Sequence, residues 1–364
     1  MYVKSVTVKN FRNLKNQTVF LGKGLNLFRG LNAQGKTNFL EAVALCALGK
    51  SPRCDRDKEL INWESEFASV KTDFVSYYGD GKVEIKLTRT EKKRVAVNGL
   101  PILKIGELLG KINVVYFSPD EIAVIRQGPD ARRRFMDIDL CQTDKNYFYT
   151  LGRYNRILFQ RNNLLKSGGD SLKQMLSIWD GQLADEGAKI FFKRQDFLAK
   201  LSPVASKIHE EITDGKEKLL LEFQSELNGK DKNEVKENFL KKLSDGFEKE
   251  ARLCYTTTGP HRDDIKFSVN GVDIRKFGSQ GQQRTAALSL KLAEVNLIAK
   301  LSDDPPILLL DDVFGELDGK RRNRLLNYAK GIQTIVTSAE PDIEEIQGEA
   351  KVFCVANGKI TANN

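Results

Sequence analysis

Residues 28–37 of this chain, Phe-Arg-Gly-Leu-Asn-Ala-Gln-Gly-Lys-Thr, contain the pattern G-x-x-x-x-G-K-T of a phosphate-binding loop. Gly30 and Gly35 let the backbone curl so that successive N–H groups point at a phosphate. Lys36 can then reach the β- and γ-phosphates of a nucleotide, and the Thr37 hydroxyl can bind Mg²⁺. The other residues predicted to contact the nucleotide in this loop are Leu31, Asn32, Ala33, Gln34 and Asn38.

The flanks of the loop match the setting that the motif needs. Residues 24–28 predict a short strand, and residues 39–45 predict an apolar helix. A strand, a loop and a helix in this order direct the positive end of the helix dipole at the phosphate. A glycine-rich turn capped by Thr37 is the alternative, and motifs later in the chain argue against it.

The length of 364 residues predicts about two domains. The net charge is +9. The excess of Lys and Arg favours a polyanionic partner such as nucleic acid, although a basic surface can serve solubility alone. The five cysteines form no C-x-x-C pair, which predicts a reducing cytoplasm and argues against a zinc site. No run of 18 apolar residues occurs, so we expect no membrane span.

Strand-like segments occur in both the first and the last third of the chain. They are expected at 82–87, 94–97, 112–117, 265–269, 307–310, 333–337 and 352–355. The glycines of segment 79–81 predict a turn. The all-apolar strand 307–310 is typical of a parallel sheet that is buried on both faces.

The middle of the chain has a helical composition. Residues 126–254 are rich in Lys, Glu, Leu and Gln, with interruptions expected at Gly168-Gly169 and at Pro203. We therefore predict an α/β ATPase domain made of 1–125 and 255–364. The predicted inserted helical domain is 126–254.

The sequence Ile-Leu-Leu-Leu-Asp-Asp at 307–312 is an apolar strand that ends in two carboxylates. Such a strand places Asp311 beside the phosphate-binding loop, where it can hold Mg²⁺ directly or through water. Asp312 then lies where a base can orient the attacking water. A helix cap at these aspartates is the alternative, and the phosphate-binding loop makes the Mg²⁺ role the better interpretation.

The stretch 277–285 resembles the signature loop L-S-G-G-Q of ABC-type ATPases, with Ser279 and Gly281 at matching places and Gln280 replacing a glycine. Ser279, Gly281 and Gln282 are expected to contact a nucleotide. Residues 285–297 predict a helix whose N-terminus faces an anion. In ABC-type ATPases that anion is the γ-phosphate held by the opposite subunit, and Glu316-Leu317-Asp318 resembles their D-loop. This resemblance implies a head-to-tail homodimer that encloses two ATP molecules, with each monomer hydrolysing poorly alone.

The insert between the two halves of the site has a diagnostic length. Lys36 and Ser279 are 243 positions apart (279 − 36). Transporter cassettes have far shorter inserts, and chromosome-structuring SMC proteins have far longer ones with sustained heptads, which are missing here. The predicted fold is therefore α/β: an ABC-type P-loop ATPase head with a mostly parallel sheet plus antiparallel strands, and a helical lobe without long coiled coil.

Several motifs together are similar to the RecF family. They lie at 10–13, 30–37, 117–119, 128–129, 132–135, 160–165, 258–264 and 279–284. The resemblance implies a cytoplasmic, ATP-dependent protein of recombinational gap repair. Such a protein binds gapped DNA or junctions of single- and double-stranded DNA, and helps RecO and RecR to load RecA. It also implies roles in replication restart and in the SOS response.

Residue roles follow from the same resemblance. Lys36, Asp312 and Ser279 are expected to act in a slow, switch-like ATPase, because Asp312 stands where many relatives carry the longer Glu. Arg12 is a candidate for adenine or α-phosphate contact. Thr337-Ser338 stands where transporter-type heads carry a switch His, so the identity of the γ-phosphate sensor stays open. His261 is expected to be structural or to face DNA.

A basic region is the expected DNA contact. Residues 126–166 hold nine Lys or Arg against four Asp, with tyrosines interleaved. The predicted DNA-binding residues are Arg126, Arg132, Arg133, Arg134, Arg153, Arg156 and Arg161. Contacts of these side chains to phosphates would be sequence-independent and salt-sensitive, whereas solvated helix faces are the alternative for each one.

Three functions fit the motifs to different degrees. The first is an ATP-gated DNA clamp, in which ATP closes a dimer on DNA. The second is a motor or transporter cassette, against which the long helical insert argues. The third is an ATP-binding scaffold that docks repair proteins with little direct grip on DNA.

Overall fold

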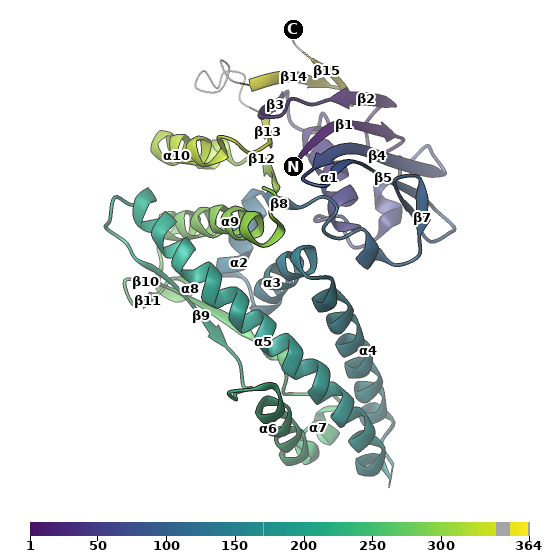
Figure 1. Ribbon diagram of the computed structural model, residues 1–364, viewed down its shortest axis with the longest axis vertical. Coiled ribbons are helices and arrows are strands. Elements are labelled where there is room, and N and C mark those ends of the chain that lie inside the picture. Colours follow the sequence, from purple (N-terminus) through teal and green to yellow (C-terminus); the bar gives the residue numbers. More distant parts are fainter. Residues whose placement is uncertain (170, 340–349, 363–364) are drawn as a thin grey trace. The chain divides into compact units, whose positions relative to one another are not determined.

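The computed structural model of this chain describes residues 1–169, 171–339 and 350–362. These residues form two compact units, one of Met1–Ile122 with Leu288–Asn364 and one of Ala123–Ala287. Figure 1 shows the elements of both. The predicted bounds of the two domains, 1–125 with 255–364 and 126–254, stay a prediction.

A six-stranded, mostly parallel sheet forms the centre of the first unit, in the order β15-β14-β3-β13-β12-β8. Its strands are β3 Leu25–Arg29, β8 Val114–Phe117, β12 Ile307–Asp311, β13 Thr334–Ser338, β14 Ala350–Ala356 and β15 Lys359–Ala362. Only the pair β14–β15 is antiparallel. Every residue of β12 and β13 is buried, which explains why β12 reads as a continuous apolar run.

The second sheet of this unit is antiparallel, in the order β2-β1-β4-β5-β6-β7. Its strands are β1 Tyr2–Lys9, β2 Gln17–Phe20, β4 Phe67–Ser76, β5 Gly79–Thr88, β6 Arg94–Val97 and β7 Leu100–Ile102. The turn expected at 79–81 is wrong, because these residues begin β5 and the reversal occurs at Tyr77 and Tyr78. Gly81 lies opposite Phe74, where a Cβ would clash with the aromatic ring.

Helix α1 (Lys36–Leu48) contacts strands of both sheets in the first unit. Its residues are buried on nearly every side, so its apolar side chains do not form a single stripe. The shorter elements of this unit are η1 Asp57–Leu60, η2 Ile105–Glu107, η3 Pro119–Ile122, η5 Phe314–Glu316 and α10 Gly319–Ala329. The unit boundary falls within α9 (Gln280–Ser302).

The second unit is mainly helical. Its helices are α2 Ala123–Arg126, α3 Pro129–Thr143, α4 Lys145–Ser167, α5 Leu172–Ile212, α6 Lys232–Asp245, α7 Phe247–Leu253, η4 Pro260–Arg262 and α8 Ile274–Phe277. Helices α4 and α5 lie side by side as an antiparallel pair (Figure 1), since Arg161 bonds Asp180 and Arg194 bonds Tyr147. The described part of this unit is therefore a helical hairpin with further elements against it, and its described helices form no long coiled coil, as expected.

Two local expectations in this unit are wrong. Pro203 does not end a helix but lies inside α5, because packing along this 41-residue helix outweighs one lost backbone hydrogen bond. A strand was missed at β9 (Leu219–Gln224), which pairs with β10 (Asp264–Val269). Strand β10 also pairs with β11 (Val272–Asp273), which completes a three-stranded antiparallel sheet.

Across the described helices of both units, none is long and apolar enough to cross a membrane.

Candidate nucleotide-binding site

The phosphate-binding loop connects β3 to α1 as the motif predicts. Positive φ angles occur at Gly30 (156°), Ala33 (64°) and Gly35 (114°), so the backbone curls where the two glycines were expected to allow it. A Cβ at Gly30 would clash with the carbonyl oxygen of Val355, and one at Gly35 would lie 2.9 Å from Asn13 Oδ1. Both glycines are therefore required by close approach as well as by φ.

Lys36 lies at the first position of α1 and is buried. Its Nζ donates to the carbonyl oxygens of Gly30 at 2.7 Å and Leu31 at 2.9 Å. Burial lowers the pKa of Lys36 from its ordinary value, while the carboxylates of Asp312 and Asp311 act in the opposite direction. The ammonium group is thus held inside the loop with two carboxylates nearby.

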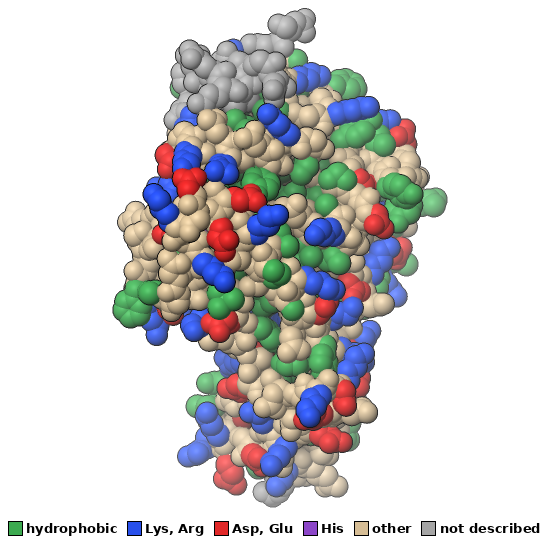
Figure 2. Space-filling model, turned by 60° about the vertical axis from the view of Figure 1, so that its left-hand side comes forward, with side chains coloured by type: hydrophobic (Ala, Val, Ile, Leu, Met, Phe, Trp, Pro, Cys, Tyr) green, Lys and Arg blue, Asp and Glu red, His purple; other side chains and the backbone are tan. Residues whose placement is uncertain are grey.

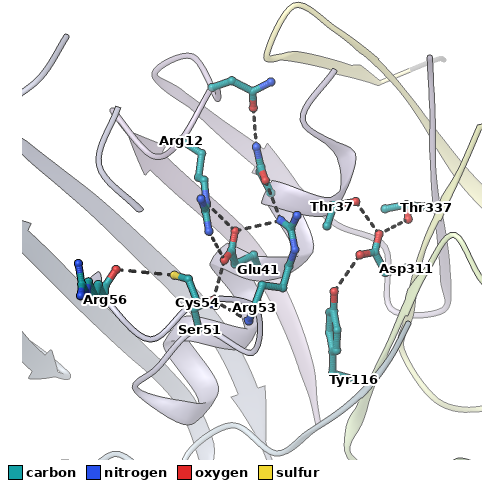
Figure 3. A network of polar contacts seen from close by, with 12 residues as sticks. Arg12, Thr37, Glu41, Ser51, Arg53, Cys54, Arg56, Tyr116, Asp311 and Thr337 are labelled. Carbon is teal, nitrogen blue, oxygen red and sulfur yellow. Dashed lines mark hydrogen bonds and ion pairs between the residues drawn. The ribbon is translucent and has the colours of Figure 1, made fainter. Parts of the chain in front are cut away.

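Asp311, the last residue of β12, is the centre of a hydrogen-bond network (Figure 3). Its Oδ1 accepts from Thr37 Oγ1 and from Thr337 Oγ1, each at 2.8 Å. Its Oδ2 accepts from the Tyr116 hydroxyl at 2.8 Å. Burial, first of all, and the Asp311 carboxylate raise the pKa of Tyr116 well above its ordinary value, so this hydroxyl stays a donor.

The residues at Asp311 fit a magnesium ion. Mg²⁺ binds oxygen at about 2.0–2.1 Å in an octahedron, so that two adjacent ligand oxygens lie about 2.9 Å apart. The distance of 2.8 Å between Thr37 Oγ1 and Asp311 Oδ1 suits two such adjacent positions. Mg²⁺ typically takes one or two protein ligands and completes its shell with phosphate and water, and one hydroxyl with one carboxylate is that kind of donor set.

Asp312 follows directly and lines the cavity described below. Its φ of 54° turns the backbone out of the strand, and its N–H donates to Thr337 Oγ1 at 2.9 Å. Thr337 therefore bonds both carboxylate residues. From the sequence, Thr337 was noted only as a residue that replaces a switch His. Its place in a strand after the Asp-Asp pair could have indicated its contact with Asp311 and Asp312.

Arg12 belongs to a second network in Figure 3, around the fully buried Glu41 of α1. Arg12 donates to both Glu41 oxygens, at 2.9 and 2.8 Å. Arg53 Nη1 donates to Glu41 at 3.3 Å, and Ser51 Oγ does so at 2.6 Å. Arg53 and Glu41 were missed, because nothing in the local sequence pairs them with Arg12.

A cavity of about 570 Å³ opens at these two networks. Its lining is Arg12, Asn13, Asn32, Ala33, Gly35, Lys36, Thr37, Asn38, Arg53, Glu59, Ile61, Asn62, Trp63, Glu64 and Asp312. Seven of the residues predicted for the nucleotide, namely Arg12, Asn32, Ala33, Gly35, Lys36, Thr37 and Asn38, are thus brought to one cavity together with Asp312. Leu31 is exposed on the loop, and Gln34 accepts from the backbone N–H groups of Asn357 and Gly358.

The predicted signature residues lie in the second unit, at the start of α9. Ser279 Oγ accepts from the N–H of Gln282 at 3.2 Å, and Gln282 Oε1 accepts from the N–H of Ser279 at 3.0 Å. This reciprocal pair is a capping box. Gln282 Nε2 also donates to Glu217 Oε1 at 3.0 Å. Ser279 and Gly281 are exposed, so the Ser279 hydroxyl keeps a proton that it can donate outward.

The predicted DNA-binding arginines differ sharply in burial. Arg132 and Arg161 are each 1% exposed. Arg132 pairs with Asp264, and Arg161 pairs with Asp180 and Glu250. This corrects their assignment, because a buried, ion-paired guanidinium has no access to a DNA phosphate.

The other five arginines lie closer to solvent. Arg133 bonds Asp130 and the carbonyl of Asp263, and Arg153 pairs with Glu186 at 3.0 Å. Arg126 is exposed and donates to Gln283. Arg134 and Arg156 are exposed on α3 and α4. On the face drawn in Figure 2, basic and acidic side chains are intermixed.

His261 and the D-loop residues have structural partners. His261 bonds the Tyr154 hydroxyl at 2.7 Å and the Thr256 carbonyl at 3.0 Å. Asp318 caps α10 through the N–H of Arg321. The side chain of Glu316 lies outside the described residues.

Comparisons with known proteins agree with this geometry. A family model for an AAA domain matches residues 5–252. The DNA replication and repair protein RecF of Halothermothrix orenii is 45% identical over 99% of this chain and 99% of its own length. The RecF protein of Acetivibrio thermocellus is 43% identical, with 95% of each chain covered.

Solved structures of RecF are also similar to this chain over its whole length. A structure described as the recombination mediator protein RecF-ATP in the RecFOR pathway has a TM-score of 0.92 and 36% identity, and covers 100% of this chain and 98% of its own. An SMC head bound to the C-winged helix domain of ScpA, at 16% identity, has a TM-score of 0.59 over 100% of this chain and 98% of that one, which shows a shared fold.

Proposed function

This chain belongs to the RecF family of DNA replication and repair proteins, and we propose that it is an ATP-dependent, DNA-binding switch of recombinational gap repair. The proposal rests on one observation, a hydrogen bond between the phosphate-binding loop and the strand that ends in Asp311. Thr37 of the phosphate-binding loop bonds Asp311 of β12, at the cavity that Lys36 and Asp312 line.

In the proposed site, Lys36 exchanges its bonds to the Gly30 and Leu31 carbonyls for bonds to the β- and γ-phosphates of ATP. Thr37 and Asp311 would hold Mg²⁺, and the ion would supply positive charge that offsets the charge of the phosphates. The remaining loop residues and Arg12 surround the nucleotide.

Hydrolysis in this proposal transfers the γ-phosphoryl group to water. Asp312 orients the water, whose oxygen forms a bond to the γ-phosphorus while the bond to the bridging oxygen of ADP breaks. The short Asp312 side chain reaches this water less well than a glutamate would. The ATPase is therefore proposed to be slow and to act as a switch.

The proposed active species is a head-to-tail homodimer. Ser279 and Gly281 are exposed at the N-terminus of α9, where a helix dipole and a hydroxyl can meet the γ-phosphate bound by a second copy. ATP binding would thus close the dimer, and hydrolysis would open it.

The first experiment is light scattering after size-exclusion chromatography, with and without ATP and Mg²⁺. Wild type is expected to form a dimer only with ATP, and Ser279→Arg is expected to stay monomeric. Ser177→Arg, which places the same side chain on the exposed side of α5, is the matched control and should dimerise. A Ser279→Arg protein that dimerises like wild type would overturn the signature assignment.

The DNA and protein partners belong to the same proposal. We assign the DNA contact to Arg126, Arg134 and Arg156, with Arg133 and Arg153 beside them, and propose that the substrate is gapped DNA or a single/double-strand junction. The protein is further proposed to act in the cytoplasm with RecO and RecR in loading RecA, and to serve replication restart and the SOS response. Its membership in this family supports these roles.

One observation favours the scaffold alternative. Two of the seven candidate arginines are buried and two more are paired with acids, which reduces the basic surface. Fluorescence anisotropy with a gapped duplex, ATP and increasing salt separates the two functions. A direct grip predicts salt-sensitive binding that Arg156→Ala weakens, whereas a scaffold predicts weak binding that Arg156→Ala leaves unchanged.

A further inference from the structure

A tryptophan stands exposed at the candidate nucleotide cavity. Trp63 is 94% exposed, although its indole is among the largest apolar groups in proteins, and it lines the same cavity as Lys36 and Thr37. Scattered exposed apolar residues are common. An indole at the edge of a polar cavity is different, because its flat face is available to whatever enters.

The segment that carries Trp63 is held in place by hydrogen bonds. Asn62 N donates to Asn10 O at 2.8 Å, and Asn62 Nδ2 donates to Arg12 O at 2.7 Å. Arg89 donates to the carbonyl oxygens of Asn62 at 3.1 Å, Trp63 at 3.4 Å and Ser65 at 3.0 Å. The backbone that carries Trp63 is therefore fixed next to the backbone of Arg12, at the edge of the cavity.

The cavity lining has two chemically different parts. Lys36, Thr37 and the loop N–H groups form a part that suits phosphate. The segment 59–64 contributes Ile61 and Trp63 together with the carboxylates of Glu59 and Glu64, which would repel phosphate. A ligand that matches both parts is anionic at one end, and at the other end it is flat, uncharged and able to donate from an amino group.

We infer that Trp63 is the stacking platform for the base of the bound nucleotide. This inference rests on the proposed function and deepens it, since it assigns the base to segment 59–64 and the phosphates to the loop. Base–aromatic stacking tolerates any base, because every base has a π-face. The indole therefore supplies affinity, and the neighbouring carboxylates favour bases that carry an exocyclic amino group, as adenine does.

The test compares ATP with inorganic tripolyphosphate, which has the phosphates without a base. Titration calorimetry with Mg²⁺ is expected to show that Trp63→Ala binds ATP about tenfold more weakly than wild type, as removal of one stacking ring typically gives. Tripolyphosphate should bind both proteins equally. Trp63→Phe keeps a ring and should retain most of the ATP affinity.

A second readout uses the indole itself. The chain has two tryptophans, so the Trp179→Phe protein has Trp63 as its single indole. ATP is expected to quench the fluorescence of this protein, and tripolyphosphate is expected to leave it nearly unchanged.

The outcomes test the Trp63 stacking assignment and the proposed nucleotide site separately. If Trp63→Ala binds ATP like wild type, or loses ATP and tripolyphosphate to the same extent, the stacking assignment is overturned while the phosphate site stands. If wild type binds neither compound, the proposed nucleotide site itself is overturned.

Discussion

Thr37 Oγ1 donates a 2.8 Å hydrogen bond to Asp311 Oδ1 across 274 positions of the chain. Thr37 lies in the first turn of α1, directly after Lys36, and Asp311 ends the buried strand β12. Because Thr337 and Tyr116 hold the same carboxylate, its orientation is set before any ligand arrives. Partners of this kind around a metal ligand commonly control metal affinity and activity.

Thr337→Val should reduce Mg²⁺-dependent ATP hydrolysis about tenfold or more, because a group that orients a metal ligand is lost. It should also lower the free energy of unfolding by about 1–3 kcal/mol, since the Asp312 N–H loses its acceptor. Steady-state hydrolysis and urea unfolding measure the two effects. Thr334→Val is the control, because the side chain of this buried Thr on the same strand donates to a nearby backbone carbonyl, Ile332 O, rather than to Asp311. Equal losses in both variants would contradict the assigned role.

Arg12→Ala should destabilise the protein by about 2 kcal/mol more than Arg53→Ala does. Arg12 makes two short bonds to the fully buried Glu41, whereas Arg53 makes one longer bond to Glu41 and is more exposed. Removing the main partner of a buried carboxylate leaves its charge poorly compensated. Urea unfolding of the two variants tests this. If they are equally stable, Glu41 does not depend on Arg12, and any loss of ATP binding in Arg12→Ala reports nucleotide contact alone.

Glu217→Ala should weaken the proposed ATP-dependent dimer about thirtyfold. The Gln282 side chain loses its acceptor, and a hydrogen bond worth about 1 kcal/mol is lost at each of two interfaces. ATP binding by the monomer should not change, because the P-loop lies in the other unit. Light scattering over a range of protein concentrations gives the dimer affinity. Glu222→Ala, which removes an exposed partner of Lys266, is the control. A dimer of unchanged affinity would mean that Glu217 does not position the signature loop.

His261 should make stability fall with acid. Burial, as the largest cause, lowers the pKa of His261 to about 4 in the folded protein, against about 6.5 in an unfolded chain. The unfolded state then binds the proton first, so this contribution is fully present above pH 6.5 and is lost as the pH falls towards 4. Between pH 7 and pH 5, wild type should lose about 2 kcal/mol more than His261→Gln.

The comparison with His261→Gln isolates this histidine. Burial also raises the pKa of the neighbouring Asp263, to about 6, but that group titrates in both proteins. Its contribution therefore cancels in the difference. Urea unfolding at the two pH values gives the result, and parallel losses in the two proteins would show that His261 does not carry the pH dependence.

The sequence alone predicted the parts of the site that depend on neighbouring residues. The glycine spacing around Lys36 specifies a curled loop, and four apolar residues before Asp311 specify a buried parallel strand. Both predictions are confirmed by β3, α1 and β12. The α/β class and the helical insert could be predicted for the same reason, since periodicity and composition report local structure.

Tertiary structure decided which charged groups meet one another. Arg132 and Arg156 look alike in the sequence, yet Arg132 is buried against Asp264, 132 positions away, and Arg156 is exposed. The partners of Glu41 have no local signal, and the only sequence signal for the contact of Thr337 with Asp311 is that its strand follows the Asp-Asp pair. The sequence determined the chemistry available at each position, and the fold decided its use, because burial and pairing depend on residues that the chain brings together only when it folds.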